Sequence, residues 1–172
     1  LFSAVEISRE KNLLKGHQGE VFSVAISTDG KTIVSGGRDG TVRMWNPKGE
    51  QIGQPFKGHQ VVVSSVAISR DGQTIVSGGF DGTVRMWNRE GRQIGQPFKG
   101  HQGQVSSVAI STDGQTIVSV GFDGTVRMWN REGQQIGQPF QGHQDWVNSV
   151  AISTDGQTIV SGGFDGTVRM WN

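Results

Sequence analysis

Short runs of alternating apolar and small or polar residues recur along the chain, each bounded by turn residues. The run from Val21 to Ser27, VFSVAIS, alternates with the period of two that is typical of a half-buried strand. An Asp-Gly turn of the kind that hairpins favour precedes KTIVSGG, and a second one precedes TVRMW. A looser segment, EQIGQPFKGH, can supply a fourth strand, and Pro55 within it favours an edge position. The pattern therefore predicts a set of four short antiparallel strands.

The same pattern returns every 42 residues. The dipeptide Gly-His occurs four times at this spacing, and DGTVRMWN begins at Asp39, Asp81, Asp123 and Asp165. The chain thus divides as one unit, 1–172, with repeats 5–46, 47–88, 89–130 and 131–172, in which residues 1–14 form an N-terminal segment. Four strands per repeat of this length make one propeller blade. We therefore expect an all-β fold, a β-propeller with four blades per chain.

The Gly-His dipeptide, the Asp-Gly turn 22 residues after the His and the closing Trp resemble the WD-repeat family from about Lys15 onward. The closing dipeptide is Trp-Asn rather than Trp-Asp, at a position that is often variable in that family. The resemblance places one His, Ser, Asp and Trp of each repeat in a side-chain hydrogen-bond network. The four predicted networks are His17, Ser35, Asp39, Trp45; His59, Ser77, Asp81, Trp87; His101, Ser119, Asp123, Trp129; and His143, Ser161, Asp165, Trp171.

A Ser, His and Asp set could also indicate hydrolytic chemistry. Such a site needs an exposed Ser beside oxyanion donors, and one copy suffices, whereas four copies under an indole indicate structure. Successive His residues belong to different blades, so they do not converge on a metal. We expect no catalytic residues, metal or cofactor, and an enzyme with an axial site is the less favoured alternative. The Arg of each TVRMW is expected to pack its stem between blades with its head at a surface.

The near-identical repeats differ mainly three and five residues after the His and directly before the turn Asp. In the WD-repeat family these positions lie on the top face around the central opening and commonly contact partners. Aromatic residues gathered there predict a surface for a protein or peptide, with Trp146 as the best candidate. The alternative is that the Phe rings lie over neighbouring glycines and only seal the blades. The predicted surface comprises Trp146, Phe164, Phe122, Phe80, Arg38, Phe22, Val62, Glu20, Gln104 and Asn148.

Charge and composition exclude several classes of partner. The formal net charge is +1 without a cluster of Lys or Arg, which argues against nucleic acid and anionic membranes. Cysteine is absent, and the apolar runs are too short to cross a bilayer. Without a visible signal peptide we expect a cytoplasmic protein. Leu1 indicates a trimmed product, a fragment or missing preceding residues.

The number of blades predicts an assembly. The resemblance implies wedge-shaped blades of roughly 45–50° that suit rings of seven or eight, and two chains supply eight. We expect a homodimer that forms one eight-bladed ring, in which each N-terminal strand (about 8–15) completes the partner's last blade. The rival is a fragment of a longer array. For function, a scaffold for protein or peptide binding is favoured; a recently amplified or engineered self-assembling propeller without a specific ligand is the alternative.

Overall fold

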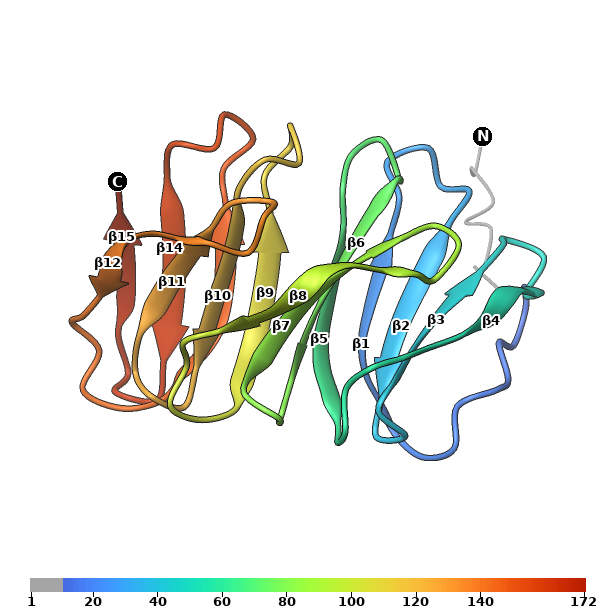
Figure 1. Cartoon of the computed structure of the whole chain (residues 1–172), viewed down its shortest axis with the longest axis horizontal. Helices are drawn as coiled ribbons and strands as arrows, with labels where there is room; N and C mark the ends of the chain where they lie inside the picture. Colours follow the sequence, from blue (N-terminus) through green and yellow to red (C-terminus); the bar gives the residue numbers. More distant parts are fainter. Residues whose placement is uncertain (1–10) are drawn as a thin grey trace, which may run out of the picture.

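The computed structural model describes residues 11–172, which form four antiparallel sheets. Figure 1 shows the sheets side by side in a single row, with β1–β4 at one end and β13–β15 at the other. The strands are β1 (Val21–Ile26), β2 (Ile33–Gly37), β3 (Thr41–Trp45), β4 (Gln51–Lys57), β5 (Val63–Ile68), β6 (Thr74–Gly79), β7 (Thr83–Asn88), β8 (Gln93–Lys99), β9 (Val105–Ile110), β10 (Ile117–Gly121), β11 (Val126–Trp129), β12 (Gln135–Phe140), β13 (Val147–Ile152), β14 (Ile159–Gly163) and β15 (Val168–Trp171).

Each sheet takes its strands in sequence order, so neighbouring strands are joined by hairpins. The first three sheets have the orders β1-β2-β3-β4, β5-β6-β7-β8 and β9-β10-β11-β12. Because the fourth strand comes from the start of the next sequence repeat, each blade borrows its outer strand from the repeat that follows. The last sheet, β13-β14-β15, has three strands within the described chain. Pro55 lies in the edge strand β4, where its missing N–H removes no ladder bond to a further strand.

The first hairpin of each blade is closed by an Asp-Gly turn. In the first blade Gly30 N–H donates to Ser27 O at 2.8 Å, and Ser27 N–H donates to Thr32 O at 2.8 Å. Gly30 has a φ of 69°, a left-handed conformation that glycine adopts without a steric penalty. The Ser27 hydroxyl donates to Asp29 Oδ1 at 2.6 Å, and this bond, together with the Lys31 N–H, lowers the pKa of Asp29. The predicted turn aspartates therefore stabilise their own hairpins.

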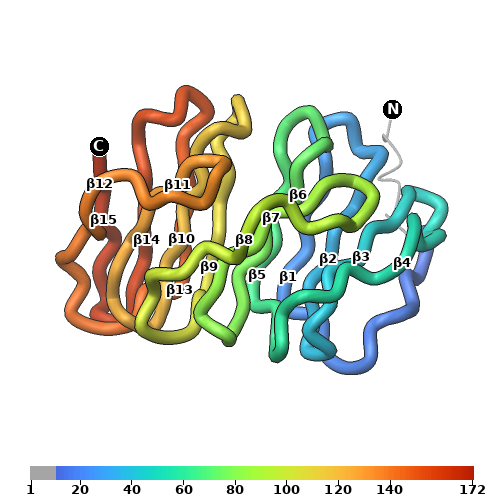
Figure 2. Tube along the Cα trace, in the orientation of Figure 1, coloured from blue at the N-terminus to red at the C-terminus, as the bar shows by residue number. Residues whose placement is uncertain are grey.

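Neighbouring sheets pack face to face, and the core lies in the three seams between them. Contacts join β1 with β5, β5 with β9 and β9 with β13, so the sheets follow one another along an open row (Figure 2). The first seam buries Val34, Val42 and Met44 of one sheet against Val63 and Val66 of the next. The second and third seams bury the repeat-matched residues in the same way. The strands are therefore stabilised by packing between sheets as well as by hydrogen bonds within them.

A β-bulge interrupts the innermost strand pair of every blade. In the first blade Val21 pairs with Gly37 and Ser23 with Gly36, which leaves Phe22 as the extra residue. The repeat-matched bulge residues in the other three blades are Ser64, Ser106 and Asn148. The Ser64 hydroxyl lies 2.9 Å from Gly78 O of its own sheet and 2.5 Å from Val105 O of the next sheet. At Ser64 the bulge thus aims the variable side chain into the seam.

The N-terminal segment forms no strand within residues 11–20. Asn12 contacts the first blade, where its Nδ2 donates to Pro47 O at 2.8 Å. Of the predicted closing strand, 8–15, the first three residues lie outside the described part of the chain. Its pairing with a partner's last blade therefore stays a prediction.

Candidate functional site

The structure brings the predicted His, Ser, Asp and Trp of each blade together. In the second blade His59 Nδ1 lies 3.0 Å from Asp81 Oδ2, and His59 Nε2 lies 2.8 Å from Ser77 Oγ. Trp87 Nε1 donates to the same Ser77 oxygen at 2.8 Å. In all four blades the His–Ser distance is 2.7–2.8 Å and the Trp–Ser distance is 2.8 Å. The four sets therefore have one common geometry.

The donors and acceptors in this network assign the protons. Trp87 Nε1–H can only donate, so Ser77 accepts that bond and donates its own hydrogen to His59 Nε2. His59 then carries its proton on Nδ1 and donates it to Asp81. The four serines are at most 4% exposed, so a substrate has no access to their hydroxyls. The arrangement satisfies buried polar groups, as a structural network does.

The network aspartates are held as carboxylates. Burial alone would raise the pKa of Asp81, but the hydrogen bonds from His59 and Thr83 outweigh it and lower the pKa far below its ordinary value. Asp123 follows the same pattern with His101. In the first blade the Gln18 N–H, His17 and Thr41 lower the pKa of Asp39 against the effect of burial.

Acid is therefore expected to destabilise the protein through these four groups. A carboxylate whose pKa is lower in the folded state contributes stability above its unfolded value, ordinarily 3.8, and loses that contribution as the pH falls below it. We expect a midpoint of thermal unfolding that is flat near neutral pH and falls steeply below about pH 4. Circular dichroism melts from pH 7 to pH 2 measure this, with Asp123→Asn as a variant that should show a shallower acid slope. An unchanged slope in the variant would contradict the assignment.

Three of the four arginines of TVRMW donate to a Gln on the outer strand of their own blade. Arg43 Nη1 donates to Gln51 Oε1 at 2.7 Å, and its Nη2 lies 3.7 Å from Asp39 Oδ2. The Arg43 side chain is 13% exposed. Arg85 and Arg127 make the matching contacts. A Gln on the outer strand thus holds each of these three guanidinium groups, and the packing of the stems between blades with the heads at a surface stays a prediction.

Five aromatic rings form a continuous row that crosses all four blades. Phe22 and Phe80 have ring centroids 6.4 Å apart, and Phe80 and Phe122 are 6.3 Å apart. Phe122 and Trp146 stack at 4.1 Å with an interplanar angle of 7°, and Trp146 meets Phe164 edge-on at 5.9 Å. Phe22, Trp146 and Phe164 are exposed, while Phe80 and Phe122 are half-buried. We call Phe22, Phe80, Phe122, Trp146 and Phe164 the aromatic row.

Backbone hydrogen bonds position the row. In each blade the N–H of the residue before the turn Asp donates to the carbonyl of the residue three after the His, at 2.8–2.9 Å. In the first blade these two residues are Arg38 and Glu20, whose exposed side chains form an ion pair of 2.8 Å. This ion pair stands where the other blades carry a Phe. The donor and acceptor pairs are Arg38 and Glu20, Phe80 and Val62, Phe122 and Gln104, and Phe164 and Trp146.

A small polar pocket adjoins the stacked pair of the row. It has a volume of about 300 Å³ and is lined by Phe122, Trp146, Gln144 and Asp145, among others. Asp145 Oδ1 accepts the Trp146 N–H at 2.7 Å. Sequence reasoning overlooked Asp145, although Gly19, Val61 and Gly103 at the matching positions mark it as a further difference between repeats. The pocket therefore places a carboxylate beside the row.

Asn148 lies beside Phe164, at one end of the aromatic row. As a bulge residue it lies at the free face of the last sheet, where it lines a pocket of about 420 Å³ together with Phe164, Ser149, Gly162 and Val168. Ser64 and Ser106, at the same position in the two middle blades, donate across seams to Val105 O and Val147 O. At the position five residues after the His, Ser64 and Ser106 therefore lie in seams, whereas the ring of Phe22 reaches Phe80.

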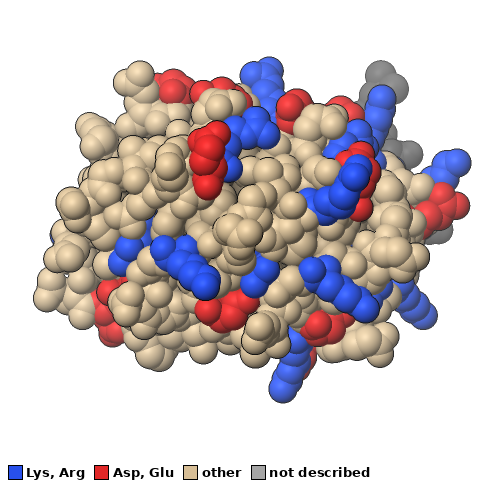
Figure 3. All heavy atoms as spheres, in the orientation of Figure 1, with Lys and Arg blue, Asp and Glu red and all other residues tan. Residues whose placement is uncertain are grey.

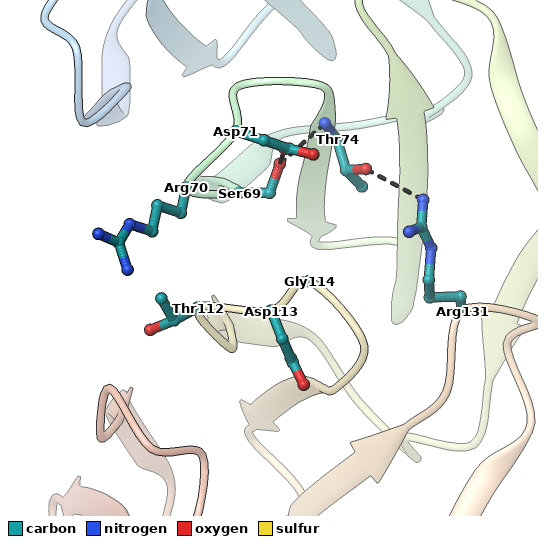
Figure 4. A pocket seen from close by; sticks show the side chains of 8 residues that line it. All are labelled: Ser69, Arg70, Asp71, Thr74, Thr112, Asp113, Gly114 and Arg131. Carbon is teal, nitrogen blue, oxygen red and sulfur yellow. Dashed lines mark hydrogen bonds between the residues drawn. The ribbon is translucent and has the colours of Figure 1, made fainter.

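A further pocket lies at the opposite ends of the strands. It has a volume of about 450 Å³ and includes Arg70, Asp71, Asp113 and Arg131. Figure 4 shows Arg131 reaching across to Thr74, where its Nη2 lies 3.3 Å from Oγ1, while Arg70 points away from the dashed contacts. Two cations and two carboxylates line this pocket, so its formal charges balance.

Charged side chains are mixed in sign over the face seen in Figure 3, where Lys and Arg lie near Asp and Glu. Residues 11–172 include no helix that is long and apolar enough to cross a membrane. Nor do the described His, Asp and Glu residues gather in a group of three or more that could hold a metal ion.

Comparisons with known proteins agree with this architecture. The family described as WD domain, G-beta repeat matches residues 8–46, 49–88, 91–130 and 133–172. An uncharacterized WD repeat-containing protein of Synechocystis is 56% identical over 41 residues, which are 24% of this chain and 3% of that protein. The small ribosomal subunit proteins RACK1 of Medicago sativa and Glycine max are each 47% identical over 36 residues, 21% of this chain and 11% of theirs. The chain thus matches only a small part of each relative, while the four family matches span almost all of it. It belongs to the WD-repeat family of β-propeller proteins.

Proposed function

We propose that this chain is a non-catalytic scaffold that binds a protein or peptide through the aromatic row. The observation that carries the proposal is the continuity of the row, in which every ring lies within 6.4 Å of the next across all four blades. Exposed aromatic clusters of this kind are typical of interaction surfaces, where rigid rings bury much apolar area at little entropic cost.

The exposed rings are not accounted for by a sealing role alone. Phe122 does lie close to Gly103, where a Cβ on that glycine would be 3.4 Å from the Phe122 Cβ. Trp146 and Phe164, however, remain 45% and 63% exposed. The Trp146 ring lines the same small pocket as the carboxylate of Asp145. The surface suits an extended segment with apolar side chains on the rings and an N–H or a cation toward Asp145.

The relatives support a role in assembly. RACK1 carries the name of a small ribosomal subunit protein, and its match to this chain covers 36 residues. We extend to this chain only the general idea of a repeat scaffold with protein partners.

Selection from a random peptide display library tests the proposal. We expect peptides rich in apolar residues to be enriched on the natural chain and to bind Trp146→Ala or Phe164→Ala at least about tenfold more weakly. Ile136→Ala removes an exposed apolar side chain from outer strand β12 and should bind as the natural chain does. Isothermal titration of the selected peptides provides the affinities.

Two outcomes would contradict the proposed function. Selected peptides that bind the Trp146 and Phe164 variants undiminished would place recognition elsewhere on the molecule. Failure to enrich any peptide would favour the alternative of a self-assembling propeller without a specific ligand.

We further propose that two chains form one eight-bladed ring, in which each N-terminal segment completes the partner's three-stranded last sheet. The open row of four sheets and the unpaired edge of β15 within the described chain support this arrangement. Leu14 occupies the repeat position of Phe56, Phe98 and Phe140, whose rings pack on the Trp of the neighbouring blade at 5.3–5.8 Å. The molecular mass, measured with the seam variants described below, tests the ring.

A further inference from the structure

The two ends of the row present apolar faces that are covered at the matching positions elsewhere. On the first sheet Val24 is 68% exposed, whereas the matching Val66 of the second sheet is 5% exposed. On the last sheet Val168 is 78% exposed, whereas the matching Val42 is fully buried. Met170 on the last sheet and Ile26 on the first sheet are also exposed, whereas Met44, which matches Met170, is buried. Each end face therefore carries the residues of a seam.

The internal seams show what such a face accepts. A Cβ placed on Gly36 would meet Val63 Cγ1 of the next sheet at 2.6 Å, so the valine lies directly over the glycine. Gly78 lies under Val105 in the same way. At the matching Gly162 of the last sheet, no described atom comes within 4 Å of this position, and the glycine lines the pocket of about 420 Å³. The surface over Gly162 is therefore open to a valine side chain from another strand.

A polar contact accompanies the valine at each seam. Ser23 Oγ accepts the Val66 N–H at 3.0 Å, Ser65 Oγ accepts the Val108 N–H at 3.1 Å, and Ser107 Oγ accepts the Val150 N–H at 3.3 Å. The corresponding hydroxyl on the last sheet is Ser149, which is exposed beside Gly162. The corresponding amide on the first sheet is that of Val24. The last sheet thus presents the acceptor and the first sheet the donor.

We propose that β1 of a second copy of this chain packs on the free face of β13–β15, with the partner's Val21 over Gly162 and the partner's Val24 donating its N–H to Ser149 Oγ. This interface rests on the proposed ring and specifies how it closes. The bulge residue Asn148 takes the place of Ser64 and Ser106, so its amide is in position to donate to the carbonyl of the partner's Val21. Two such seams, related by a two-fold axis, join two chains head to tail.

A second copy fits this face because every feature of the seam is already present in the chain. The valines, the glycine and the serine at the two ends are the residue types that build the first two internal seams. The third seam differs, since Val120 stands there in place of the glycine. The last sheet therefore retains the glycine socket of the first two seams, and the first sheet retains the valines that fill it.

Light scattering coupled to size exclusion tests the interface at micromolar concentration. We expect the natural chain to show twice the mass of one 18.5 kDa chain. Val24→Asp and Val168→Asp should each run as folded monomers, because these side chains are exposed within one chain and covered only in the dimer. Val61→Asp, which places the same charge on an exposed loop residue outside the seams, should remain a dimer.

Mixing the two variants separates loss of the seam from loss of folding. A Val24→Asp chain keeps a natural last sheet, and a Val168→Asp chain keeps a natural first sheet, so together they can form one intact seam. We expect a tagged Val24→Asp chain to capture untagged Val168→Asp but not a second Val24→Asp chain. Such capture requires that both variants are folded.

Each other outcome overturns a distinct part of the proposal. A monomeric natural chain would refute both the ring and the seam. A dimer that persists in Val24→Asp and Val168→Asp would be compatible with a ring but would refute this seam. A series of oligomers larger than the dimer would refute the closure of the ring by two copies. Trp146→Ala tests peptide binding separately from the seam, whereas Phe164 lines the same pocket as Gly162, so Phe164→Ala reports on both.

Discussion

Replacement of Trp87 by alanine is expected to lower the free energy of unfolding by about 3–5 kcal/mol. The indole is 1% exposed, packs on Phe56 at a centroid distance of 5.8 Å and donates to Ser77 at 2.8 Å. Its removal leaves a cavity in the first seam and takes one donor from a buried hydroxyl, and both effects destabilise the fold. Urea unfolding followed by circular dichroism measures the change.

Trp146 provides the matched control for this experiment. It is the same residue type, but it is 45% exposed and lies in the aromatic row. Trp146→Ala should change the free energy of unfolding by no more than about 1 kcal/mol while it weakens peptide binding. Equal losses of stability in the two variants would contradict the structural role of the network tryptophans.

The second large effect is expected from an acidic side chain placed inside a seam. Val108 is 6% exposed, and its Cγ1 would lie 2.9 Å from a Cβ on Gly78 of the preceding sheet. Val108→Asp must either bury an unpaired charge or separate the two sheets, at a cost of about 3–5 kcal/mol or more. Thermal and urea unfolding should show a large loss of stability or no cooperative folding.

Val61→Asp controls for the substitution itself. Val61 is 46% exposed in the loop after His59, so the same carboxylate there stays in water and should change stability by no more than about 0.5–1 kcal/mol. If Val108→Asp were as stable as Val61→Asp, the seams would not be the core of this protein.

Most of the fold could be predicted from the repeat. Alternation in the run that begins at Val21 and the Asp-Gly turns identify the strands, because both are local properties of the sequence. The contacts of His59, Ser77 and Trp87 come from the family resemblance, and the structure places these side chains within hydrogen-bond distance. Predictions that depend on one blade alone therefore agreed well with the structure.

Predictions that depend on how one blade meets the next were less complete. Nothing in the spacing indicates a bulge at Ser64, so its hydroxyl bond across the seam to Val105 O could not be foreseen. The hydrogen bond from Arg43 to Gln51 depends on the pairing of β3 with β4, which the sequence spacing does not give. The continuity of the aromatic row likewise depends on the stagger between sheets, which aligns Phe122 with Trp146 from the next repeat.

The borrowed outer strand has a consequence for how such arrays change length. Because each blade is completed by the repeat that follows it, duplication or deletion of any 42-residue segment, wherever its ends fall, restores the same strand order on both sides. Unequal recombination between the near-identical copies would thus alter the blade count without creating a foreign junction. Selection on length would then depend on whether the resulting number of blades closes a ring, and not on whether a single repeat folds.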